Sequence, residues 1–182
     1  VFGPLPALVN VPESHVQGFE LQGTWNPMDG LTMRAGVSYA DSEIEGPYAN
    51  FAAFGQLAEF GGQPFTAARK WHADFDVEYI WPVTGEWNAF VGANVTHQSF
   101  TRSFFYNEDP SSVQPPSVLD LPERTLLDLR AGVDGGPWRV QGWVRNATDE
   151  YYWTTAVHVN DVLLRYAGMP RTYGVTVTYR FQ

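Results

Sequence analysis

The sequence predicts an all-β fold of about seven long antiparallel strands. Three observations predict it: apolar and polar side chains alternate strictly in several segments, aromatic residues make up 15% of the chain, and 17 glycines with 13 prolines interrupt it too often for long helices. The chain has 182 residues, no cysteine and a formal net charge of −9. The lack of cysteine excludes a disulfide framework and thiolate chemistry, and the acidic balance disfavours nucleic-acid binding.

Seven segments show the two-residue alternation that is typical of strands. In chain order they cover residues 18–25, 31–40, 67–82, 87–96, 124–134, 138–145 and 172–181. Segment 67–82 is the clearest, because its even positions from 70 to 78 are ionisable while its odd positions from 71 to 81 are apolar. The apolar faces carry, in the same order, Phe19, Leu21 and Trp25; Leu31, Met33, Val37 and Tyr39; Trp71, Phe75, Val77, Tyr79 and Trp81; Trp87, Val91 and Val95; Leu127, Leu129 and Val133; Trp138, Val140 and Val144; Tyr173, Val175, Val177, Tyr179 and Phe181.

The connections between these segments alternate in length. Short ones at 26–30, 82–86 and 134–137 contain the turn formers Asn, Asp, Pro and Gly. Long ones run over 41–66, 104–122 and 149–169. We therefore expect one end of the sheet to carry only short turns and the other end to carry large loops.

The aromatic residues of the apolar faces gather at the two ends of the predicted strands. Such rings are most stable at a membrane–water interface, and no apolar run approaches the ~18–20 residues of a membrane-spanning helix. The pattern therefore favours a segment of an antiparallel transmembrane β-barrel. The residues expected at the membrane interfaces are Trp25, Tyr39, Trp71, Trp81, Trp87, Trp138, Tyr179 and Phe181.

The polar faces would then line a hydrated lumen. Asp74, Asp76 and Glu78 form a row whose charges need water or a basic partner. A cation site or a paired-carboxylate hydrolase centre is the alternative interpretation, but alternate carboxylates are ordinary on barrel walls. The expected lumen-facing residues are His72, Asp74, Asp76, Glu78, Arg124, Arg130 and Arg145.

Several motifs resemble the end of TonB-dependent outer-membrane receptors. They are the turn Asn146-Ala147-Thr148-Asp149 after the strand at 138–145, the stretch Gly168-Met169-Pro170-Arg171 before Thr172-Tyr173-Gly174, and the closing Tyr179-Arg180-Phe181. The segments 18–20, 27–31 and 36–40 are also similar to later strands of that family. The resemblance covers residues 13–181.

The resemblance implies a barrel of about 22 strands, which seven strands cannot close. We therefore expect residues 1–182 to form the C-terminal part of the barrel domain of a larger receptor, with the plug domain absent. The short turns would be periplasmic and the long loops extracellular. The implied location is the outer membrane of a Gram-negative bacterium, and the implied activity is TonB-energised uptake of a scarce nutrient such as a ferric siderophore. The implied partners are outer-membrane lipid, the plug and remaining strands, TonB through the absent N-terminal part, and the small-molecule ligand.

Residues of the long loops are the candidates for ligand binding. Exposed aromatic side chains either pack locally or meet a ligand, and arginines near the mouth either attract an anionic chelate or pair with carboxylates. The candidates are Phe104, Phe105, Tyr106, Tyr151, Tyr152, Trp153, Arg165 and Arg171.

No catalytic, metal-binding or cofactor motif accompanies these candidates. The four histidines lack metal-ligand spacing, and hydrolase, phosphate-loop and dinucleotide signatures are absent from the sequence. We therefore expect no enzyme activity and no cofactor. Two other hypotheses remain: a soluble secreted β-sandwich that binds carbohydrate through its loop aromatics, and a small autonomous outer-membrane barrel, against which seven strands argue.

Overall fold

The computed structural model describes residues 10–52, 55–105, 119–159 and 162–181. Every regular element among these residues is a β-strand. No helix in these ranges is long and apolar enough to cross a membrane.

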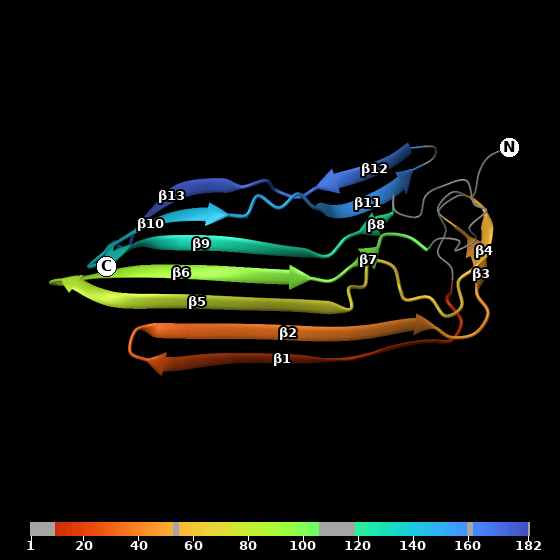
Figure 1. The fold of residues 1–182 in the computed structure, drawn as a ribbon, viewed down its shortest axis with the longest axis horizontal. Coiled ribbons are helices and arrows are strands. Elements are labelled where there is room, and N and C mark those ends of the chain that lie inside the picture. Colours follow the sequence, from red (N-terminus) through yellow and green to blue (C-terminus); the bar gives the residue numbers. More distant parts are fainter. Residues whose placement is uncertain (1–9, 53–54, 106–118, 160–161, 182) are drawn as a thin grey trace.

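Seven long strands form one antiparallel sheet, which we call the wall (Figure 1). Each strand of the wall pairs with the next long strand along the chain, and β1 and β13 form its two open edges. The strands are, in spatial order, β1 (Ser14–Met28), β2 (Leu31–Ile44), β5 (Trp71–Thr84), β6 (Trp87–Gln98), β9 (Arg124–Gly135), β10 (Trp138–Arg145) and β13 (Thr172–Tyr179).

Three small two-stranded sheets lie within the long connections. They pair β3 (Ala49–Phe51) with β4 (Leu57–Glu59), β7 (Thr101–Arg102) with β8 (Asp120–Leu121), and β11 (Trp153–Val159) with β12 (Val162–Ala167). All three lie at one end of the wall, and the short turns lie at the opposite end (Figure 1). We call the described parts of 45–70, 99–123 and 146–171 the loop cap.

The predicted all-β class, the seven long strands and the alternation of short and long connections are confirmed. Some boundaries were wrong: β1 and β2 are longer than the expected 18–25 and 31–40, and the strand expected to begin at residue 67 begins at Trp71. Ala67 has a φ of 59°, a left-handed conformation that no strand accommodates, and its backbone N–H donates to the Arg102 carbonyl at 2.6 Å. The chain therefore belongs to the loop cap until Trp71.

The buried core lies in the loop cap and not between sheets. Ile44 at the end of β2 is 0% exposed and Phe60 is 1% exposed, and they pack with Tyr48, Ala52 and Ala58. Apart from Ile44 at the end of β2, Phe90 is the one buried hydrophobic side chain in the seven wall strands as the structure describes them. A single open sheet without a second layer argues against the β-sandwich hypothesis, and its unpaired edges argue against a small closed barrel.

Aromatic clusters occupy both ends of the exposed apolar face. Near the loop cap, the Tyr39 ring lies 4.6 Å from Trp71 and 5.8 Å from Phe19, which was expected on the apolar face but not among the residues at the membrane interfaces. Near the short turns, the Tyr179 ring lies 4.7 Å from Trp138 and 4.9 Å from Phe181. Tyr79 and Trp81 stack, and Trp25 and Trp87 are exposed on the same face. Their contact with lipid stays a prediction.

Candidate functional site on the polar face and the loop cap

Strand register brings charged residues of distant segments together on the polar face of the wall. Arg34 on β2 lies opposite Asp76 on β5. Glu78 on β5 lies opposite Gly92 on β6, which in turn lies opposite Arg130 on β9. A Cβ at Gly92 would approach the Arg130 guanidinium to 2.7 Å. The missing side chain therefore lets Arg130 cross β6 and reach β5.

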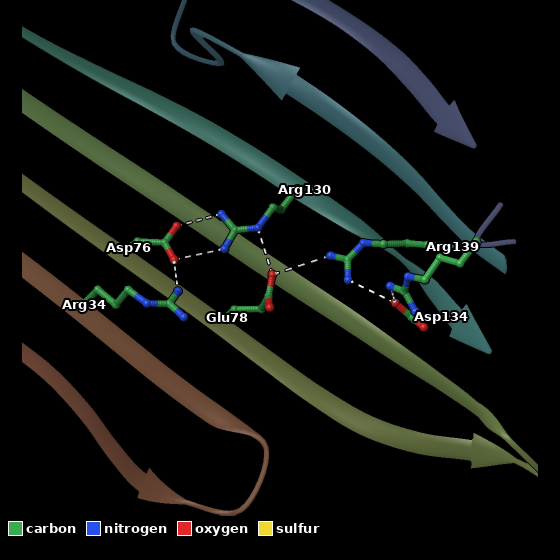
Figure 2. Close-up of polar contacts among 7 residues, drawn as sticks. Arg34, Asp76, Glu78, Arg130, Asp134 and Arg139 are labelled. Carbon is green, nitrogen blue, oxygen red and sulfur yellow. Dashed lines mark hydrogen bonds and ion pairs between the residues drawn. The ribbon is translucent and has the colours of Figure 1, made fainter. Parts of the chain in front are cut away.

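Arg130 forms the centre of an ion-pair network (Figure 2). It holds Asp76 with two hydrogen bonds, of 2.7 Å from Nη1 and 3.1 Å from Nη2, and its Nε donates to Glu78 at 3.0 Å. Arg34 donates to the same Asp76 at 3.4 Å. Such bidentate arginine–carboxylate contacts are among the stronger polar interactions in proteins.

The network continues towards the short turns. Arg139 lies 4.0 Å from Glu78 and 3.2 Å from Asp134, and Arg180 lies 3.1 Å from Asp134. These contacts connect β2, β5, β9, β10 and the residue that follows β13. We call the seven residues involved the wall network: Arg34, Asp76, Glu78, Arg130, Asp134, Arg139 and Arg180.

The wall network supplies the basic partner that the carboxylate row requires. Asp76 and Glu78 meet arginines of the wall itself. Arg130 was expected on this face, but its pairing was not predicted, because it is 52 residues from Glu78 in the sequence. Asp74 has no ion pair among the described residues and lies against Gly36. Contact of this row with a plug stays a prediction.

Arg145 lies apart from the wall network. Its guanidinium lies 5.1 Å from the centre of the Trp143 ring, and the Trp143 indole donates to Thr176 at 3.1 Å. A Cβ at Gly174 would meet Trp143 at 2.5 Å, so this glycine leaves room for the indole. A cavity of about 230 Å³ lies beside Trp143 and Arg145.

The end of the polar face next to the loop cap carries one row of hydrogen-bonding residues. Ser38, His72, Gln98 and Arg124 lie opposite one another on β2, β5, β6 and β9, and we call them the mouth row. Arg124 donates to the Trp153 carbonyl at 2.9 Å, and its guanidinium lies 4.5 Å from the centre of the Tyr152 ring.

Arg69 lies beside the mouth row. Its guanidinium donates to the carbonyl of Ser99, the residue after Gln98. Burial, together with the charge of Arg124, lowers the pKa of Arg69 below its usual value. The two guanidinium charges are thus close enough to repel each other. Sequence reasoning missed Arg69, because it belongs to a segment that was expected to be regular strand.

Of the candidate aromatic residues in the second long connection, one packs against the loop-cap core and another lines a cavity. Phe105 stacks on Phe60 with ring centres 5.2 Å apart, so it packs, partly buried, against the loop-cap core. Phe104 lines a cavity of about 370 Å³ together with Phe65, Phe100 and Lys70. Tyr106 lies outside the described residues.

In the third connection, Trp153 is the central aromatic residue. Its ring centre lies 5.2 Å from that of the exposed Tyr151 and 4.9 Å from the Arg165 guanidinium. Arg165 also donates to the Asp120 carbonyl at 2.8 Å. Burial raises the pKa of the Asp120 carboxyl, although Arg102 and Arg165 act in the opposite direction. Tyr152 faces Arg124.

Arg171 pairs with a carboxylate instead of pointing free into the mouth. Its Nη2 lies 3.7 Å from Asp149, and its backbone N–H donates to the same carboxylate at 3.0 Å. Asn146 and Asp149 have φ values of 49° and 58°, and the Asn146 amide donates to the carbonyls of Glu150 and Met169. This turn therefore fixes Arg171 at the start of β13. No three His, Cys, Asp or Glu side chains in the described ranges are placed to hold a metal ion.

Comparison with known proteins gives one family match. The family model described as "TonB dependent receptor-like, beta-barrel" matches residues 2–147. No curated protein sequence matches the chain.

Solved structures share the fold. The ferric yersiniabactin uptake receptor FyuA from Yersinia pestis superposes with a TM-score of 0.68 at 16% identity, over 93% of this chain and 24% of that one. The siderophore receptor PiuA from Acinetobacter baumannii gives 0.66 at 20% identity, over 91% and 22%. BauA, the ferric preacinetobactin receptor from Acinetobacter baumannii, gives 0.62 at 22% identity, over 91% and 22%. The chain thus spans less than a quarter of the length of each of these receptors.

Proposed function

Because the chain belongs to the TonB-dependent receptor β-barrel family, we propose that it forms part of the wall of a nutrient transporter in the outer membrane of a Gram-negative bacterium. In this proposal the chain binds and guides a ligand and carries out no catalysis. The ligand is a scarce nutrient, for which a ferric siderophore is the leading candidate.

The observation that carries the proposal is the two-sided character of the wall. One face exposes large apolar side chains from six of the seven wall strands, all but β2, including Leu21, Phe75, Val91 and Val175. The other face carries the wall network and the mouth row. A barrel in a membrane requires this separation, because its outside meets lipid tails and its inside meets water or another polar segment.

The open edges of the wall support incorporation into a larger barrel. Backbone groups of β1 and β13 that point away from the sheet have no strand partner among the described residues. In a bilayer such groups must be paired, because hydrocarbon offers no hydrogen bonds. We therefore place residues 1–182 in the C-terminal part of a barrel of about 22 strands, with a plug domain supplied by the rest of the protein.

Siderophore transport is supported by the fold neighbours, whose names describe ferric yersiniabactin uptake, siderophore binding and ferric preacinetobactin binding. In the proposal, the loop cap captures the ligand at the cell surface, the polar face holds the plug, and TonB moves the plug to open a path. The short turns face the periplasm, as in other outer-membrane barrels.

The test is uptake of radiolabelled ferric complexes by cells that express the complete receptor, with TonB present or deleted. We expect uptake that requires both the receptor and TonB. Uptake that is unchanged by loss of TonB would contradict the energised mechanism, and a receptor that partitions into buffer without detergent would contradict the membrane location.

A further inference from the structure

From the uneven pairing of polar groups along the wall we infer that the plug docks on β10 and β13, at Trp143 and Arg145, and that the transport path opens on the other side of the wall, along β2 and β5. The inference rests on the proposed function and deepens it by naming the surface that holds the plug. The plug segment that fits is a turn with a carboxylate for Arg145 and backbone amide groups for the polar side chains beside it.

In the wall network the charges are matched within the wall itself. Asp76 accepts two hydrogen bonds from Arg130 and one from Arg34. Glu78 accepts one from Arg130 and lies 4.0 Å from Arg139. A matched charge needs no further partner, whereas removing one partner of a pair that is shielded from water is strongly destabilising. A plug can therefore leave this part of the polar face without breaking an ion pair.

On β10 the polar side chains are left without such partners. A guanidinium has five N–H donors, and no hydrogen bond or ion pair within the described ranges engages those of Arg145. The Gln141 amide likewise has no hydrogen bond in the part of the chain that the structure describes. Asp128 borders the same cavity, accepts from the Asn146 backbone N–H at 2.9 Å and has no ion pair in these ranges. These groups are therefore available to a partner.

The same part of β10 holds an aromatic ring in a fixed orientation. The Trp143 indole donates to Thr176 on β13 at 3.1 Å, and the Arg145 guanidinium lies 5.1 Å from the ring centre. A Cβ at Gly174 would meet the indole at 2.5 Å, so the ring lies over this glycine. Trp143 and Arg145 border the cavity of about 230 Å³. A surface that is ordered before binding loses less conformational entropy when a partner docks.

The two surfaces lie at the same level of the wall and differ in lateral position. The register places Trp143 opposite Arg130 on β9. Through Gly92 on β6, Arg130 lies in line with Glu78 on β5. At this level the wall network extends towards β2 (Figure 2), whereas β10 and β13 lie at the far edge of the wall from β2 (Figure 1). In the proposed receptor the ionic contacts of the plug thus fall on the β10 side, and a moving plug separates first from the β2 side.

The test is labelling of single cysteines in the complete receptor, in cells, with a thiol reagent that does not cross membranes. Thr172→Cys places the cysteine opposite Arg145, and Thr32→Cys places it opposite Glu78. The parent receptor gives the background, since residues 1–182 contain no cysteine. While cells with TonB take up the radiolabelled ferric complex that the uptake test identifies, we expect labelling of Thr32→Cys to rise several-fold and labelling of Thr172→Cys to stay unchanged.

A second arm needs neither a ligand nor TonB. In cells without TonB, adding Arg145→Gln should speed the labelling of Thr172→Cys about tenfold, the shift in a docking equilibrium that loss of one charge-assisted hydrogen bond produces. Arg145→Lys keeps the charge and should retain most of the protection. The control is Asp74→Asn, at a carboxylate on β5 that has no ion pair among the described residues, and it should leave labelling of Thr32→Cys unchanged. A normal heat-dependent gel shift confirms that each variant is folded.

Labelling that rises during uptake at Thr172→Cys, at both positions or at neither overturns the inference. Unchanged protection in Arg145→Gln does so too, as does faster labelling of Thr32→Cys in Asp74→Asn, which would put the plug contact on β5. In each of these cases TonB-dependent uptake by the parent receptor leaves the proposed function standing. Absence of that uptake, with the Arg145→Gln effect present, contradicts the transport proposal and not the docking surface.

Discussion

The wall and the loop cap differ in what covers their apolar side chains, and β2 shows both situations, because its last residues pack into the core of the loop cap. Up to Tyr39 its apolar side chains point away from the polar face and pack only against neighbours on the same exposed surface. Beyond Tyr39 its other face changes from polar to buried, because Ser42 is 7% exposed and Ile44 is 0% exposed within the loop-cap core. Stability of the wall thus depends on the solvent outside it, whereas the loop cap carries a core of its own.

The largest expected effect is in the loop cap. Phe60→Ala removes a ring that packs against Phe105 and Tyr48, and a cavity of this kind destabilises a folded unit by about 3–5 kcal/mol. Limited proteolysis of cells that display the receptor should cut the loop cap faster, while the heat-dependent gel shift of the barrel stays normal. Phe51→Ala, at an exposed ring on β3, is the control and should change neither. Loss of the gel shift in Phe60→Ala would show that the two regions are not separate.

The next effect is on the apolar face of the wall. Val91 lies in the middle of β6 with 48% of its surface exposed, so Val91→Arg would place a charge among lipid tails, which destabilises barrels by about 2–4 kcal/mol at mid-membrane. Urea unfolding of the complete receptor in phospholipid vesicles measures this change. Asn88→Arg is the control, because Asn88 lies on the polar face opposite Asp134 and an arginine there meets water and an opposite charge. Equal stability of the two variants would refute the lipid-facing assignment.

The smallest effect is in the wall network. Arg130→Gln leaves Asp76 and Glu78 without their main partner and should destabilise the receptor by about 1–3 kcal/mol, the usual range for charged hydrogen bonds. The same unfolding assay applies, and added Asp76→Asn should recover part of the loss. Arg34→Gln should change stability by less than about 1 kcal/mol, because Arg34 is largely exposed and makes a single 3.4 Å contact. A larger loss from Arg34→Gln than from Arg130→Gln would contradict the central position of Arg130.

The sequence by itself determined the strands, their two faces and the position of the turns. Alternation is a local property, so Trp87–Val95 or Asp74–Glu78 shows its faces without knowledge of any neighbour. The clusters of aromatic residues near the turns follow from the same local pattern. Ala67 marks where this reasoning failed, because a contact with Arg102 holds it in a left-handed conformation.

Only the tertiary structure decided which residues meet across strands. Arg130 reaches Asp76 because the register sets Gly92 between β5 and β9, and Arg69 reaches the Ser99 carbonyl because the chain is outside the sheet until Trp71. Likewise, Phe105 is a ligand candidate from the sequence, and the fold packs it, partly buried, against the loop-cap core. The physical reason is range: side-chain alternation is fixed by neighbouring residues, whereas register and loop packing depend on contacts between residues 30 to more than 50 positions apart.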